Sequence, residues 1–113
     1  MCRGMTRFTH PRLEDVPLAG VLHALAEPAR LAIVRELACD GENGGAGLAC
    51  VATAPNLPRA TMSHHFSVLR AAGLIESRKQ GVHVINRLRC EELERRFPGV
   101  LASILAVPPA ATG

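Results

Sequence analysis

The sequence predicts a small, mainly α domain of the α+β class, with the element order helix-helix-helix-helix-strand-strand-helix. Two patterns predict it: apolar residues recur at helical spacing along most of the chain, and β-rich runs flank Gln80-Gly81 near its C-terminal third. The chain has 113 residues, 48% of them hydrophobic, which is enough for one core. We therefore expect one folded domain over residues 16–106, a flexible arm at 1–15 and a disordered tail at 107–113.

The first two helices are separated by a proline. The first follows Pro17, and its apolar residues occupy positions i, i+3, i+4 and i+7, one face of a helix: Leu18, Val21, Leu22 and Leu25. Pro28 suits the first turn of the second helix, where a missing N–H costs nothing. We expect this helix to run to about Ala38 and to end at Asp40-Gly41, since Gly41 can adopt the left-handed cap.

A glycine-rich connection, 41–47, leads to a short third helix over about 47–53, which Pro55 ends. Asn56 is a candidate cap for the fourth helix, which ends at Gly73. One face of this helix is apolar and faces inward: Met62, Phe66, Leu69 and Gly73. The opposite face carries small or hydrogen-bonding side chains: Ala60, Ser63, His64 and Ser67.

The two segments around Gln80-Gly81, 74–80 and 82–89, form the predicted hairpin. The chain then returns to a helix from Cys90 to Ala106, which Pro98-Gly99 must break or kink. Its apolar side consists of Leu93, Phe97, Val100, Leu101, Ile104 and Leu105. The third and fourth helices, followed by a hairpin, make a winged helix-turn-helix.

Positive charge is concentrated in this part of the chain. Residues 57–89 hold six Lys and Arg against one acidic residue, Glu76, a net charge of +5, so the rest carries −2 of the total of +3. Such a segment is either a solvated face or a surface for a polyanion. The chain has no Tyr or Trp, so a stacking platform for single strands is poorly supported and duplex DNA is the better partner.

The outward face of the fourth helix suits the major groove, because small side chains let a helix approach the bases while Ser and His donate hydrogen bonds. Long basic side chains on the hairpin can neutralise backbone phosphates or enter the minor groove. The candidate DNA-binding residues are Arg59, Ala60, Thr61, Ser63, His64, Ser67, Arg70, Arg78, Lys79 and His83.

Two stretches resemble the ArsR (arsenic repressor) family. They are VLHALAEPARLAIVRELA and LPRATMSHHFSVLRAAGLIESRKQGVHVINRL, and the likeness covers residues 17–106. The resemblance implies a homodimeric repressor that leaves an inverted-repeat operator when an inducer binds. It also implies pairing of the first and last helices across the dimer, through Leu18, Val21, Leu22, Leu25, Phe97, Val100, Leu101, Ile104 and Leu105.

The chain departs from the metal-sensing members of that family. The two cysteines of the arsenic type align near Gly47 and Ala49, and the last helix has Glu91, Glu92 and Glu94 but none of the histidines of the zinc type. We therefore predict no metal site and no cofactor. Cys39, Cys50 and Cys90 remain candidates for a thiol sensor, and a small molecule, a metal or a redox signal stays open as the inducer.

Other function classes are weaker. The residues offer no nucleophile–base–acid set, so we do not expect an enzyme. A winged helix that docks proteins without binding an operator is the alternative function. No apolar run is long enough to span a bilayer and the N-terminus has no apolar stretch after its basic residues, so neither a membrane protein nor an exported one is expected, and we predict a cytoplasmic protein.

Overall fold

The computed structural model describes residues 10–42, 48–49 and 57–108. The elements follow the predicted order except at residues 48–49, which form a strand, and a short 3-10 helix precedes them. They are η2 (Leu13–Asp15), α1 (Leu18–Leu25), α2 (Pro28–Glu42), β1 (Leu48–Ala49), α4 (Arg59–Ala71), β2 (Ile75–Gln80), β3 (His83–Leu88), α5 (Cys90–Arg96) and α6 (Val100–Ala106).

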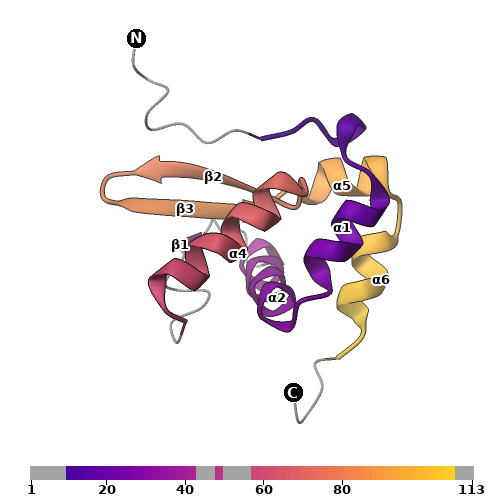
Figure 1. Cartoon of the computed structure of the whole chain (residues 1–113). Helices are drawn as coiled ribbons and strands as arrows, with labels where there is room; N and C mark the ends of the chain where they lie inside the picture. The colour runs from indigo at the N-terminus through magenta and orange to yellow at the C-terminus, as the bar shows by residue number, and fades with distance from the viewer. Residues whose placement is uncertain (1–9, 43–47, 50–56, 109–113) are drawn as a thin grey trace.

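The molecule has two ends with different elements (Figure 1). The β2–β3 hairpin and the start of α4 extend to one end, and α1, α5 and α6 gather at the other. Helix α2 lies between them and contacts α1, α4 and β3. Among the described residues, no helix is long and apolar enough to cross a membrane.

One hydrophobic core joins the elements. Side chains of α2 and α4 form its centre, including Ile33, Val34, Phe66 and Leu69, all at most 1% exposed. The inward stripe predicted for the fourth helix is therefore part of the core, although Met62 is only partly buried. Burial of this stripe fixes which face of α4 is left for solvent.

The hairpin has the predicted position. Strands β2 and β3 are antiparallel, with Gln80 opposite His83, and the two-residue connection is Gly81-Val82. Gly81 has a φ of +64°, while no non-glycine residue of the described chain has a positive φ, which is the sign pattern of a type II′ turn. Glycine at the first turn position is thus the residue that closes the hairpin.

The prediction of a helix over residues 47–53 is wrong at residues 48 and 49. Leu48 and Ala49 form β1, which pairs with Asn86 and Ile85 of β3 and makes a three-stranded sheet of order β1-β3-β2. Two residues are too few to show a strand period in sequence, and the open edge of β3 supplies the hydrogen-bonding partner. The rest of that helix and most of the glycine-rich connection lie outside the described residues. The predicted Asn56 cap is wrong: α4 begins at Arg59, so Pro58 is its N-cap residue, and no side chain of the described residues makes a cap hydrogen bond there.

One helix boundary differs from the prediction and another agrees with it. Helix α2 continues through Gly41 to Glu42, because a glycine near a helix end is tolerated at a cost of about 1 kcal/mol. The break at Pro98-Gly99 is confirmed: α5 ends at Arg96 and α6 starts at Val100, with Gly99 at a φ of +78°.

Residues 10–15, predicted to belong to a flexible arm, are instead docked on the domain. Leu13 and Val16 are buried, and Arg96 of α5 donates hydrogen bonds to the carbonyl oxygens of both. His10 accepts a hydrogen bond from β2, and Pro11 accepts one from Arg89. Leu13 and Val16 are the only aliphatic residues in 10–16, too few to define a period. Residues 1–9 lie outside the described chain.

Candidate nucleic-acid interface

Helix α4 exposes a continuous polar face. It is 13 residues long, and its buried residues are His65, Phe66 and Leu69. Every candidate contact between its start and its third turn is exposed: Arg59, Ala60, Thr61, Ser63, His64 and Ser67. The division of faces that the sequence predicts is present, and the outward surface is not covered by the rest of the described protomer.

His65 anchors the opposite side of α4. Its Nδ1 lies 3.2 Å from a guanidinium nitrogen of the buried Arg30, whose Nε donates to the carbonyl oxygen of Ala24 at 2.7 Å. Arg30 therefore joins the C-terminal end of α1 to α4, where a cation also complements the helix dipole. His65 is therefore a packed structural residue, and His64 is left on the exposed face.

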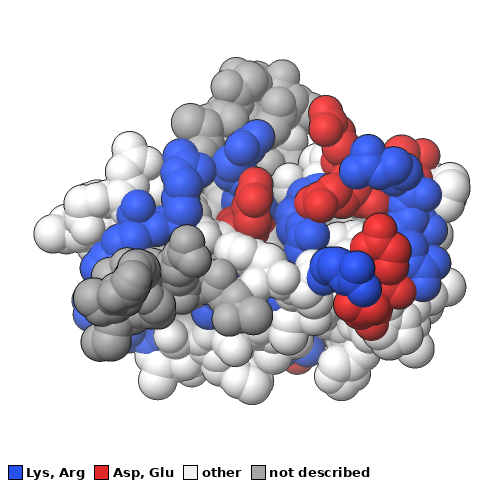
Figure 2. Space-filling view, turned by 90° about the horizontal axis from the view of Figure 1, so that it is seen from above, with Lys and Arg blue, Asp and Glu red and all other residues white. Residues whose placement is uncertain are grey.

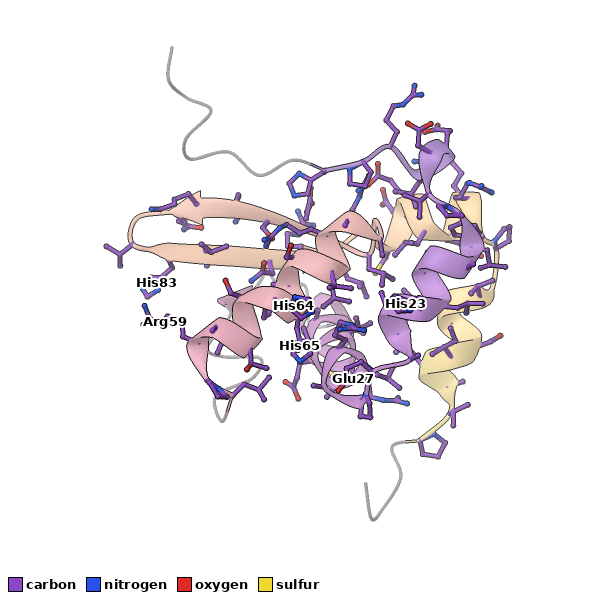
Figure 3. All side chains as sticks on the ribbon, in the orientation of Figure 1. His23, Glu27, Arg59, His64, His65 and His83 are labelled. Carbon is purple, nitrogen blue, oxygen red and sulfur yellow. The ribbon has the colours of Figure 1, made fainter. Side chains whose placement is uncertain are left out.

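The hairpin presents basic residues near its turn. Arg78, Lys79 and His83 are all exposed, and the turn residue Val82 is 88% exposed. Figure 3 shows His83 of β3 and Arg59 of α4 at the same end of the molecule. Residues far apart in the sequence thus supply basic groups to one surface.

The charges are unevenly distributed over the molecule. In Figure 2, Lys and Arg spread over the hairpin end with acidic groups only toward the middle, whereas the α5 end mixes both signs. The acidic residue of the hairpin is Glu76, which lies 3.8 Å from Arg87. The hairpin end is therefore the more positive one, which favours an approaching polyanion.

Some arginines of the basic segment serve the fold instead. Arg89 is buried, and its guanidinium donates to Glu92 at 2.8 Å and to the carbonyl oxygen of Pro11 at 2.9 Å. Arg70, a candidate DNA contact, is half-buried and donates to the hydroxyl of Ser77 at 3.2 Å. Counting charges along the sequence thus overstates the surface charge, and it misses the link that Arg70 makes between α4 and β2.

The candidate dimer surface divides into two groups. Val21, Leu25 and Phe97 are buried in the core of the protomer, so they are not available to a second chain, and the prediction is corrected for these three. Leu18 and Leu22 on α1 are 42% and 45% exposed. On α6 no residue is buried, and four apolar ones are half-exposed: Val100, Leu101, Ile104 and Leu105.

The cysteines offer weak support for a thiol sensor. Cys39 and Cys90 are exposed, and Cys50 lies outside the described residues. Although the residue is exposed, desolvation by neighbouring atoms raises the pKa of the Cys90 thiol, which lowers its reactive thiolate fraction. Within residues 10–42, 48–49 and 57–108, no three His, Cys, Asp or Glu side chains are grouped to hold a metal ion.

The sequence relatives are transcription regulators. A family described as a helix-turn-helix domain matches residues 25–78. The HTH-type transcriptional regulator YceK of Bacillus subtilis is 32% identical over 100 residues, covering 86% of this chain and 95% of its own length. The HTH-type transcriptional regulator MJ1325 of Methanocaldococcus jannaschii is 35% identical over 63 residues, covering 56% and 67%.

Solved structures agree. An ArsR-like transcriptional regulator from Rhodococcus sp. RHA1 is 31% identical, with a TM-score of 0.57 over 79% of each chain. The transcriptional repressor BigR from Xylella fastidiosa shares the fold at 22% identity, with a TM-score of 0.57 over 80% of this chain and 88% of BigR. The chain therefore belongs to the ArsR-like family of winged helix-turn-helix transcriptional regulators, and it is a regulator and not an enzyme.

Proposed function

We propose that this chain is a repressor that binds an inverted-repeat operator as a homodimer. The observation that carries the proposal is the exposed face of α4, which has small and hydrogen-bonding side chains and begins with Arg59. A helix of this kind fits the major groove, and Ser63 and His64 on it can reach base edges or phosphates. Helix α4 is therefore the proposed sequence-recognition element.

The hairpin supplies the second contact. Arg78 and Lys79 are exposed on β2, on the same end of the molecule as the start of α4. We place them against the phosphate backbone or the minor groove beside the site that α4 occupies, where cations release condensed counterions. These contacts add affinity for any sequence, and those of α4 add specificity.

The dimer brings two copies of α4 to one operator. Leu18 and Leu22 are the exposed large apolar residues of α1, and α6 lies at the same end of the molecule, away from the hairpin. Exposed apolar side chains on two helices at one end of the molecule favour pairing with a second copy. In a two-fold dimer the two α4 helices enter successive major grooves roughly 34 Å apart.

We also propose that an inducer releases the protein from DNA. The inducer belongs to one of three classes: small molecules, metals or oxidants. Zinc, arsenite, peroxide and persulfide are the first compounds to test against a preformed complex. Because a transcription regulator acts on chromosomal DNA, we also propose a cytoplasmic location.

The decisive experiment is selection of duplexes from a randomised pool by the wild-type chain, followed by a gel shift with the enriched duplex. Arg59→Ala combined with His64→Ala should lose the enriched sequence while the variant stays folded and dimeric. Arg95→Ala, which removes an exposed cation from the α5 end, is the matched control and should bind like the wild type. If no duplex is enriched, the chain is a protein-docking module instead.

A further inference from the structure

Ser77 of β2 is the centre of a buried polar network. Its side chain is inside the protein, with the residue 5% exposed. Its hydroxyl donates to Oδ1 of Asn86 on β3 at 2.6 Å and accepts from Arg70 of α4 at 3.2 Å. Its backbone N–H donates to Nε2 of His10 at 2.9 Å. One serine thus joins α4, both strands of the hairpin and the N-terminal segment.

The network occupies a place where apolar residues would pack. Along β2 the buried positions are Ile75 and Ser77, and Asn86, directly opposite Ser77 in the register, is 0% exposed. Burying such groups costs free energy unless each is hydrogen-bonded. Each bond has a direction, so a satisfied network permits fewer relative positions of its elements than an apolar contact does.

The network joins the two elements that carry the proposed DNA contacts. Arg70 is in the last turn of α4, and Arg78 and Lys79 follow Ser77 directly on β2. The helix and the hairpin can bind one stretch of duplex together only if the position of one relative to the other is fixed. The hydrogen bonds of Ser77 run between these two elements, and on β2 they lie directly beside Arg78 and Lys79.

We propose that Ser77 is a positioning residue, which sets the hairpin relative to α4 so that both contact the same site on DNA. The residue touches no DNA itself and acts through Arg70 and Asn86. This role rests on the proposed function, because it concerns how the operator is bound.

The test compares Ser77→Ala with Ser77→Thr, which keeps the hydroxyl, and with Ser103→Ala, an exposed serine of α6. The probes are the duplex that the wild type enriches and a random duplex of equal length. Ser77→Ala should bind the enriched duplex about tenfold more weakly and the random duplex within about threefold of the wild type, so the specificity ratio falls. Ser77→Thr should recover most of the ratio, and Ser103→Ala should keep it.

A purely structural role gives a different result. It lowers the melting temperature and the active fraction of Ser77→Ala, but the folded molecules keep the wild-type specificity ratio, and that outcome overturns the proposal. Amide hydrogen exchange supplies a readout without DNA: exchange in residues 75–88 should be faster in Ser77→Ala than in Ser103→Ala. If the wild type enriches no duplex, the proposed function fails. If residues 75–88 also exchange equally fast in Ser77→Ala and Ser103→Ala, the positioning role of Ser77 is rejected as well.

Discussion

The backbone N–H of Ser77 donates a hydrogen bond of 2.9 Å to Nε2 of His10, a residue 67 positions earlier in the chain. Strand β2 lies at an edge of the sheet, so this N–H has no neighbouring strand to pair with. A ring nitrogen that accepts a hydrogen bond carries no proton, so the contact requires His10 in its neutral form. The docking of the N-terminal segment is therefore sensitive to pH.

The first prediction concerns this pH dependence. Burial, and then the positive charge of Arg89 and Arg70, lower the pKa of His10, while Glu76 and Glu92 oppose the shift. A histidine with a lowered folded-state pKa stabilises the fold fully above its ordinary pKa of 6.5, and this stability is lost as the pH falls through the folded-state pKa. Urea unfolding at pH 7.5 and at pH 5.5 should show the loss.

His10→Gln is the control for this titration. The glutamine side chain can place an acceptor near the position of Nε2 but does not titrate. Its free energy of unfolding should change less between the two pH values than that of the wild type. Equal changes in both proteins would assign the pH dependence to other groups.

The second prediction compares two glycines with the same backbone conformation. Gly73, at the end of α4, and Gly99 both have a φ of +78°, but a Cβ at Gly73 would lie 3.2 Å from Cγ2 of the buried Val16, and a Cβ at Gly99 would meet nothing within 4 Å. Gly99→Ala should cost about 1–2 kcal/mol of unfolding free energy from the positive φ alone. Gly73→Ala should cost at least about 1 kcal/mol more, because the site is already packed.

Chemical denaturation of both alanine variants measures this difference directly. Equal losses would show that Leu13 and Val16 are not packed against the end of α4 in solution. A larger loss at Gly73 would show that the N-terminal segment is part of the folded domain, which the sequence prediction of a flexible arm missed.

The elements that the sequence predicted correctly are those with a strong local pattern. Helix α4 has a full amphipathic period, from Met62 through Phe66 to Leu69, and a glycine just beyond its end. The hairpin has Gly81 at the turn position where positive φ is required. In both cases the residues that decide the structure are neighbours in the chain.

The elements that the sequence analysis did not predict depend on contacts between residues far apart in the chain. Strand β1 exists because β3 offers an edge, and residues 10–16 dock because Arg89 and Arg96 supply donors to their carbonyl groups. A charge count cannot tell whether an arginine faces solvent or a carbonyl oxygen. The buried polar network around Ser77 was not predicted, because its partners come from α4, β3 and the N-terminal segment.

The third prediction is the salt dependence of DNA binding. Arg59, Arg78 and Lys79 are exposed in each protomer, which gives six cations in the proposed dimer. If each neutralises one phosphate, the logarithm of the affinity should fall with the logarithm of salt concentration with a slope of about −5. Arg78→Ala combined with Lys79→Ala removes four of them and should reduce the slope to about −2.

Titrations of one duplex at several salt concentrations measure both slopes. Arg95→Ala is again the control, since its side chain is exposed at the opposite end. An unchanged slope in the double variant would mean that the hairpin does not contact the backbone, and the hairpin part of the proposed function would be withdrawn.

The fourth prediction separates dimerisation from folding. Leu22 is 45% exposed in the protomer, so a charge there does not disturb the core, whereas Val21 beside it is 2% exposed. Leu22→Glu should therefore leave the folded protomer intact while placing a carboxylate in the proposed apolar interface, where it remains desolvated and unpaired. Sedimentation should show monomers, and affinity for the enriched duplex should fall because each monomer holds only one half-site.

Leu22→Met tests the same position without a charge. Methionine keeps the apolar surface and nearly the same volume, so this variant should remain dimeric and bind the duplex like the wild type. If Leu22→Glu also stays dimeric, the interface lies elsewhere than on α1. If it becomes monomeric and still binds the whole duplex tightly, a single protomer suffices for recognition, and the inverted-repeat arrangement is wrong.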